Sequence, residues 1–192
     1  MNKINELNVS LVSTDSLGTV IAATRTESDF LAALDSGVNT IFDLDPDIMT
    51  VASRLKKAHG SGKKLFVHID LSKGIGRDES GIKYLKLLGI DGIISTKSSM
   101  IRTARDLGLM TVQRFFIVDS RFIDSTADVL KNAKPHMIEI MPGTVTKVIS
   151  KLKATTSTPI IAGGLIETSE ELASALMCGV AAVSTGKREL WG

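Results

Sequence analysis

The sequence predicts a single α/β domain over residues 1–192 that closes as a (β/α)8 barrel, the TIM-type fold, with short loops. Three observations lead to this fold class. Eight short runs are almost continuously apolar, as expected of parallel strands covered on both faces. A helical segment separates each run from the next, and several of these helices stop at a glycine directly before the strand. Such barrels usually need about 250 residues and at least roughly 200. This chain has 192 residues, so its loops must be short.

The predicted strands are short and rich in branched aliphatic residues, which fill the interior of parallel barrels. Only 4% of the residues are aromatic, so aliphatic side chains must form most of the core. A doubly wound open sheet is the competing topology, but a GxGxxG turn is missing after the first run, where Ala23, Thr24 and Arg25 stand. The eight runs are residues 20–24, 40–44, 65–70, 92–96, 110–118, 137–141, 159–162 and 181–184.

The predicted helices begin with side-chain oxygens that can cap free backbone N–H groups and with acids that suit the positive helix end. A short final helix is expected over residues 187–191. The candidate starts are residues 26–29, 45–47, 78–80, 119–120 or 124–125, and 168–171. The candidate stops are Gly37, Gly60, Gly89, Gly108 and Gly179.

Composition excludes several classes of protein. Lys and Arg total 23 against 21 acids, and this charge of +2 lacks the basic excess of a dedicated nucleic-acid domain. The single cysteine, Cys178, excludes an intramolecular disulfide and a cysteine-based zinc cluster. The chain opens without a basic and apolar leader, and its apolar runs fall far short of the ~20 residues of a membrane span. We therefore expect a soluble cytoplasmic protein that does not enter membranes.

Two glycine turns follow the last two predicted strands and form the most specific motif. Glycine lets backbone N–H groups approach a ligand closely, hydroxyls add donors, and a helix starting at Lys187 would point its positive end inward. Loops after strands 7 and 8 form the usual phosphate site of such barrels. The alternative is that both turns are merely tight loops. The predicted phosphate cradle comprises Gly163, Gly164, Ser184, Thr185 and Gly186.

Charged side chains at other strand ends predict the rest of a ligand cup. His68 and Asp70 should point the same way in a strand, and a basic loop from Lys73 to Arg77 follows them. Read conservatively, His68 is a hydrogen-bonded core residue and Lys73 a solvated charge. Cations suit a phosphate and carboxylates suit hydroxyls. The remaining predicted pocket residues are Asp43, Lys97, Arg114 and Glu139.

The same set of residues could serve an isomerase, with Asp70 or Glu139 as base and Lys97 as electrophile. A metal site has little support, because His59 and His136 lie outside any strand end and no helical pair of histidines exists. Basic pairs on the predicted surface could touch RNA, although most such charges only aid solubility. They are Lys147 with Lys151, Arg102 with Arg105, Lys56 with Lys57, and Lys63 with Lys64.

Several motifs together resemble the bacterial glycerol-3-phosphate responsive antiterminators, which regulate the glycerol uptake operon. The resemblance covers residues 19–191. It departs at residues 45–48, which read DPDI where members tend to have Gly-Asp-Ile, and at Gly186, where many members carry Ser. The motifs are HIDLSKGIGRDESG (68–81), DGIISTK (91–97), TVQR (111–114), IEIMPG (138–143), PIIAGGLI (159–166) and AVST (182–185).

The resemblance implies a regulator without enzymatic activity or cofactor. It would bind glycerol 3-phosphate as an effector and then act on leader mRNA, so that transcription passes a terminator and the message is stabilised. Gly163, Gly164, Ser184 and Thr185 would hold the phosphate, and the other cup residues would line the pocket. A homodimer joining two modest basic patches would fit the near-neutral charge. The alternative from the residues alone is a barrel enzyme, an isomerase or phosphodiesterase, acting on a small phosphorylated metabolite.

Overall fold

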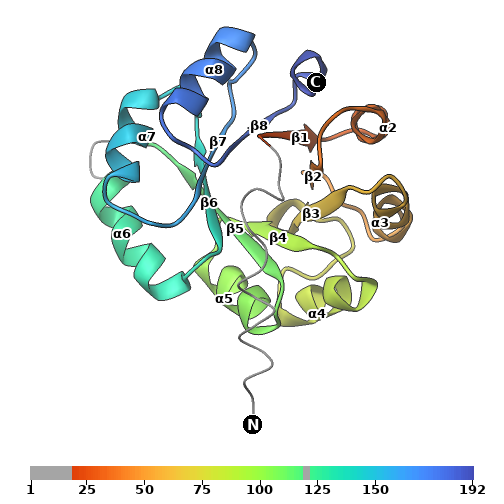
Figure 1. The fold of residues 1–192 in the computed structure, drawn as a ribbon. Helices are drawn as coiled ribbons and strands as arrows, with labels where there is room; N and C mark the ends of the chain where they lie inside the picture. Colours follow the sequence, from red (N-terminus) through yellow and green to blue (C-terminus); the bar gives the residue numbers. More distant parts are fainter. Residues whose placement is uncertain (1–18, 119–121) are drawn as a thin grey trace.

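A computed structural model describes residues 19–118 and 122–192 as a closed barrel of eight parallel strands in chain order (Figure 1). Each strand pairs with its chain neighbours, and β1 closes the barrel against β8. The predicted closed barrel is therefore confirmed, and the open-sheet alternative is wrong. The strands are β1 (Val20–Thr24), β2 (Thr40–Asp43), β3 (Lys64–His68), β4 (Gly92–Ser95), β5 (Met110–Phe116), β6 (Met137–Met141), β7 (Ile160–Gly163) and β8 (Ala182–Thr185).

Seven α-helices in the described residues surround the barrel, one after each of the first seven strands (Figure 1). After β8 the predicted final helix is only a single 3-10 turn, η3 (Arg188–Leu190). Another 3-10 turn, η2 (Ile69–Leu71), follows β3. The helices are α2 (Glu27–Asp35), α3 (Val51–Gly60), α4 (Glu79–Leu88), α5 (Ser98–Asp106), α6 (Phe122–Ala133), α7 (Thr146–Lys153) and α8 (Ser169–Met177).

Three predicted helix starts are confirmed by their caps. Thr26 and Thr168 each form a reciprocal capping box, and Asp78 accepts a hydrogen bond from Gly81 N. The start predicted at residues 45–47 is wrong, because Asp47 is used in a turn before α3 and accepts from Met49 N at 2.8 Å. Residues 119–120 lie outside the described residues, and residues 124–125 fall within α6.

The barrel interior is apolar in its lower part and polar at the carboxyl ends of the strands. Phe42 and Phe66 pack at 5.5 Å between ring centroids, and a Cβ at Gly92 would overlap the Phe66 ring. Above this apolar part lie buried polar side chains, which places a polar site at one end of a rigid frame. The apolar interior comprises Ile21, Phe42, Leu44, Phe66, Ile94, Val112, Met137, Ile161 and Ala182. The polar layer comprises His68, Arg114, Glu139 and Ser184.

The end of the chain is tied to the barrel. Trp191 is 2% exposed, and its indole Nε1 donates to the carbonyl of Thr185 at 2.9 Å. Gly37 N donates to the carbonyl of Gly192 at 3.0 Å. These contacts hold the segment after β8 in place and thereby fix one wall of the site described next. Within residues 19–118 and 122–192, no helix has the length and apolar character needed to cross a membrane.

Candidate functional site

A cavity of about 370 Å³ opens at the carboxyl ends of the strands. Its walls come from the ends of β6 and β8 and from the segments that follow β1, β2, β7 and β8, and its floor includes Arg114 of β5. This is the end at which (β/α)8 barrels carry their ligand sites. The cavity is lined by Ala23, Arg25, Asp29, Leu44, Arg114, Glu139, Met141, Gly164, Leu165, Ile166, Glu167, Ser184, Thr185, Gly186 and Lys187.

The turn after β7 requires its glycines. Gly164 has a φ of +73°, and a Cβ there would come within 2.6 Å of Met141 Cε. At Gly163, a Cβ would lie 2.5 Å from both Glu139 Oε1 and Ser184 Oγ. Gly186 is different, because a Cβ there would meet only the Ala23 carbonyl oxygen, at 3.5 Å. Gly186 therefore lines the cavity without being sterically required.

Backbone donors are available around this cavity. The N–H groups of Gly164, Leu165 and Gly186 donate to no other residue in the described part of the chain. All three residues line the cavity. Backbone N–H groups that converge without protein partners are suited to bind an anion.

The two hydroxyls predicted to bind phosphate are already used by the protein. Ser184 Oγ donates to Glu139 Oε1 at 2.5 Å. Thr185 Oγ1 donates to the carbonyl of Ile166 at 2.7 Å and accepts from Lys187 N at 3.0 Å. Both side chains thus join neighbouring strands and loops and fix the cradle's shape. A three-residue η3 is also too short to supply the helix end expected there.

A buried ion pair forms the floor of the cavity. Arg114 Nε donates to Glu139 Oε2 at 2.5 Å, and these side chains are only 4% and 1% exposed. Since Ser184 binds the other carboxylate oxygen, Glu139 is held by two partners. Arg114 lines the cavity, and a guanidinium fixed in this way suits oxygen-rich ligands.

His68 and Asp70 lie close together, but not for the predicted reason. Asp70 belongs to η2 rather than to β3, and its carboxylate accepts from Ser95 Oγ, Thr96 N and Thr96 Oγ1 at 2.7–2.8 Å. Burial opposes ionisation of Asp70, but these hydrogen bonds outweigh it and lower its pKa. Asp70 therefore fixes the loop after β4 and is absent from the cavity lining.

His68 is a buried neutral imidazole. It is 4% exposed, and neither ring nitrogen has a hydrogen-bond partner in the described residues. Its Nε2 lies 3.7 Å from Asp70 Oδ2. Burial, aided by the nearby charges of Arg114 and Arg25, lowers the pKa of His68 to about 4. Arg114 and Arg25 line the cavity, whereas His68 is absent from the cavity lining.

This pKa predicts acid sensitivity of the fold. The unfolded chain takes up the His68 proton near pH 6.5, whereas the folded chain takes it up only near pH 4. The free energy of unfolding should therefore fall as pH drops through this window, by at most about 3 kcal/mol from His68. Urea unfolding of the wild type and His68→Gln at pH 7.5 and 4.5 measures it.

The control for this test is the part of the free energy of unfolding that His68→Gln still loses when the pH falls. Burial also lowers the pKa of His136, so His68→Gln should retain that part of the acid sensitivity. Asp70 acts only at lower pH, because its pKa lies below the ordinary value of 3.8. An equal loss in both proteins would contradict the assignment to His68.

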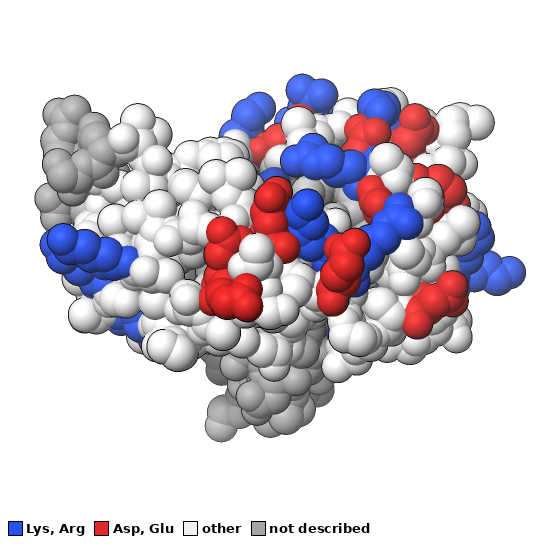
Figure 2. Space-filling model, turned by 90° about the horizontal axis from the view of Figure 1, so that it is seen from above, with Lys and Arg blue, Asp and Glu red and all other residues white. Residues whose placement is uncertain are grey.

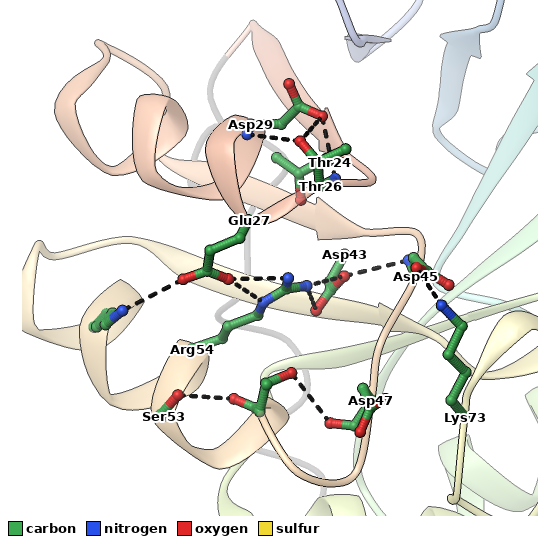
Figure 3. A network of polar contacts seen from close by, with 12 residues as sticks. Thr24, Thr26, Glu27, Asp29, Asp43, Asp45, Asp47, Ser53, Arg54 and Lys73 are labelled. Atoms are coloured by element: carbon green, nitrogen blue, oxygen red, sulfur yellow. Dashed lines mark hydrogen bonds and ion pairs between the residues drawn. The ribbon is translucent and has the colours of Figure 1, made fainter.

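Asp43 does not reach the cavity, which corrects its prediction as a pocket residue. Its side chain is fully buried outside the barrel, and both of its carboxylate oxygens accept from Nη1 of Arg54 on α3, at 2.9 and 3.0 Å (Figure 3). Arg54 also binds Glu27 of α2 at 3.0 Å. Burial raises the pKa of Asp43, and the Arg54 guanidinium opposes this shift. The network joins β2 to two helices.

Lys73 and Lys97 also lie outside the cavity lining. Lys73 Nζ pairs with Asp45 Oδ2 at 2.6 Å, and its backbone forms a bridge with Asp47, so the loops after β2 and β3 are joined (Figure 3). Lys97 is exposed and directly precedes α5. Of the predicted residues, the structure thus brings Arg114, Glu139, Gly164, Ser184, Thr185 and Gly186 to the cavity wall, with Gly163 behind them.

The cavity rim contains charges that the prediction left out. Arg25 directly follows β1, and the rule that strand ends carry the site does select it, although it was left out of the predicted cradle and cup. Asp29 lines the cavity from α2 and is bound by Arg188 at 2.6 Å, while Lys187 lies 3.9 Å from Glu167. Positive and negative side chains alternate across the middle and right of the face seen in Figure 2. Within the described residues, no group of three or more His, Cys, Asp or Glu could hold a metal ion.

The fold and the site define the class of protein: a closed (β/α)8 barrel with a ligand-sized cavity between the loops after β7 and β8. The profile of the family described as "Glycerol-3-phosphate responsive antiterminator" matches residues 20–191. The chain belongs to this family.

The chain is also similar to one bacterial protein in sequence and to two solved structures. The chain is 38% identical over 173 residues to the uncharacterized protein YgcP of Escherichia coli (strain K12), covering 90% of this chain and 91% of that protein. It is 30% identical to the glycerol uptake operon antiterminator regulatory protein of Listeria monocytogenes str. 4b F2365, with a TM-score of 0.85 over 90% of this chain and 94% of the other. For an antiterminator-related protein of Thermotoga maritima MSB8, identity is 31% and TM-score 0.81, over 91% and 98% of the two chains.

Proposed function

We propose that the protein is a glycerol-3-phosphate-responsive antiterminator. Glycerol 3-phosphate binds in the cavity, and the liganded protein binds the leader mRNA of a glycerol-metabolism operon. Transcription then passes a terminator, and the message is stabilised. Family membership supports this function, and the cavity with its free backbone donors is the observation that carries it.

The chemistry of the cavity suits the effector. The N–H groups of Gly164, Leu165 and Gly186, with the cationic side chains of Arg25 and Lys187 beside them, would bind the phosphate. The Arg114–Glu139 pair on the floor offers donors and acceptors to the hydroxyls of the glycerol part. The phosphate therefore lies at the mouth and the polyol points into the barrel.

Calorimetry with glycerol 3-phosphate, glycerol and inorganic phosphate tests this assignment. We expect saturable binding of glycerol 3-phosphate, weaker binding of phosphate and none of glycerol, because the phosphate supplies the charge that the cradle recognises. No binding of glycerol 3-phosphate at millimolar concentrations would contradict the proposal. If the effector gates RNA binding, leader RNA must bind more tightly in its presence than in its absence. A ligand changes the balance between two states of a protein only when it binds them with different affinities.

The enzymatic alternative is weaker because the predicted acid–base groups are already hydrogen-bonded or lie outside the cavity lining. Glu139 is held by Arg114 and Ser184, and Asp70 accepts three hydrogen bonds outside the cavity lining. Lys97, the electrophile in that mechanism, lies outside the lining too. Structural relatives at 12% identity, an aldolase and an epimerase among them, share only the fold. Turnover of phosphorylated sugars above background would revive this alternative.

A further inference from the structure

The surface of α7 is unusual for its unpaired positive charge. From Ile140 to Ile166 the sequence contains no Asp or Glu, but it contains Lys147, Lys151 and Lys153. All three side chains are exposed, and none lies within ion-pair distance of an acid in the described residues. Lys147 and Lys151 are one helical turn apart, opposite the buried Ile149 and Leu152.

In each of the other basic pairs singled out from the sequence, at least one member has a partner in the structure. Lys63 Nζ donates to the carbonyls of Ser36 and Val38 at 2.7 and 2.6 Å, and Lys57 pairs with Glu27 at 3.4 Å. Arg105 binds Asp106 and the carbonyl of Ala133. These cations stabilise the barrel, whereas those of α7 do not.

A groove runs beside the α7 lysines. It has a volume of about 200 Å³ and lies between α6 and the end of α7. Lys131 reaches it from α6, and its pairing with Asp128 at 3.8 Å is highly exposed and therefore weak. The opposite wall carries hydroxyl side chains. The groove is lined by Ala127, Leu130, Lys131, Leu152, Thr155, Thr156 and Ser157.

Ammonium groups beside hydroxyls are the chemistry that recognises a sugar–phosphate backbone. In Figure 2, which keeps the left-to-right arrangement of Figure 1, blue atoms lie on the side of α6 and α7. We take an RNA rather than an acidic protein as the partner, because three hydroxyls of the groove can bind ribose and phosphate.

The α7 surface is also connected to the cavity. Gly143, three residues before α7, donates its N–H to the carbonyls of Gly163 and Gly164 at 2.6 and 3.0 Å. A Cβ at Gly143 would lie 2.9 Å from Gly163 N, so this packing is tight. A ligand held by the turn after β7 therefore acts on the loop that begins α7.

We propose that Lys147, Lys151 and Lys153 of α7, together with Lys131 across the groove, form the surface that binds the RNA backbone. This inference rests on the proposed function, and it locates the RNA on the helix that joins the two cavity strands β6 and β7. The contacts position the RNA and do not select its sequence.

The test measures binding of a labelled leader transcript from a glycerol-metabolism operon, with saturating glycerol 3-phosphate, over a series of salt concentrations. The variant Lys147→Gln/Lys151→Gln/Lys153→Gln should bind roughly tenfold or more weakly, and its plot of log affinity against log salt should be flatter by about 2, since each lost contact on single-stranded RNA removes ~0.7. The matched control, Lys56→Gln/Lys83→Gln/Arg102→Gln, removes the same charge from exposed positions of α3, α4 and α5 and should bind like the wild type.

The possible outcomes test the α7 surface and the RNA-binding function separately. Calorimetry with glycerol 3-phosphate should give wild-type binding for both variants, which shows that they fold. Equal weakening by both variants, or by neither, would overturn the α7 surface and leave the RNA-binding function standing. A wild type that binds no RNA would overturn the proposed function itself. If vesicles containing phosphatidylglycerol then bind the wild type and not the α7 variant, the surface serves a membrane and the inference is also overturned.

Discussion

Replacing Gly164 by Val is expected to lower the affinity for glycerol 3-phosphate by roughly a hundredfold or more, a loss of about 3 kcal/mol. Two physical effects combine. The backbone of Gly164 has a φ of +73°, which a β-branched residue adopts only with strain. The new Cβ also meets Met141 Cε at 2.6 Å, so the Met141 side chain must move in the cavity wall. Calorimetry at equal protein concentration measures the loss.

A second glycine separates the effect on the cavity from the effect on the backbone. Gly179 has nearly the same φ, +76°, but a Cβ there meets nothing within 4 Å. It lies after α8 and outside the cavity lining. Gly179→Val should therefore destabilise the fold by the same backbone strain, of order 1–3 kcal/mol, and still bind the effector. If Gly164→Val and Gly179→Val bind glycerol 3-phosphate equally well, the cradle has been placed at the wrong turn.

The barrel could be predicted from the sequence because its signals are local and repeat eight times. Apolar runs, capping residues such as Thr26 and Thr168, and the glycines that end helices all recur with the same order. The same repetition predicts the strand ends at which Gly164 and Arg114 lie, and both of these residues line the cavity. The positions at which strands end were predicted less accurately. The third predicted run extends to Asp70, whereas β3 ends at His68.

What the sequence could not decide is which way a side chain faces. In a parallel strand both faces are buried, so the apolar pattern does not distinguish the interior of the barrel from its outer surface. Phe42 faces the barrel interior and Asp43 faces outward, yet both belong to the same predicted run, residues 40–44. The partner that explains Asp43 is Arg54, which lies on α3 and has no fixed spacing from β2. Similarly, no local pattern shows that Ser184 is occupied by Glu139, 45 residues away.

The second large expected effect is a loss of stability when the partner of the outward-facing Asp43 is removed. Arg54→Ala should lower the free energy of unfolding by about 3–5 kcal/mol, because it leaves a fully buried carboxylate without its counter-charge. It also removes the contact of the guanidinium with the Phe30 ring, 5.3 Å from the ring centroid. Urea unfolding at neutral pH measures the change. The control is Lys57→Ala on the same helix, whose exposed pair with Glu27 should contribute at most about 1 kcal/mol.

The same network distinguishes a structural role of Asp43 from a role in ligand binding. In Asp43→Asn/Arg54→Ala no unpaired charge is buried, so part of the lost stability should return. Asp43→Asn should bind glycerol 3-phosphate like the wild type, because the Asp43 side chain faces Arg54 and is absent from the cavity wall. A loss of affinity in this variant without a loss of stability would restore Asp43 to the binding site and contradict the network. The opposite pattern, stability lost and affinity kept, is what a buried ion pair outside the barrel requires.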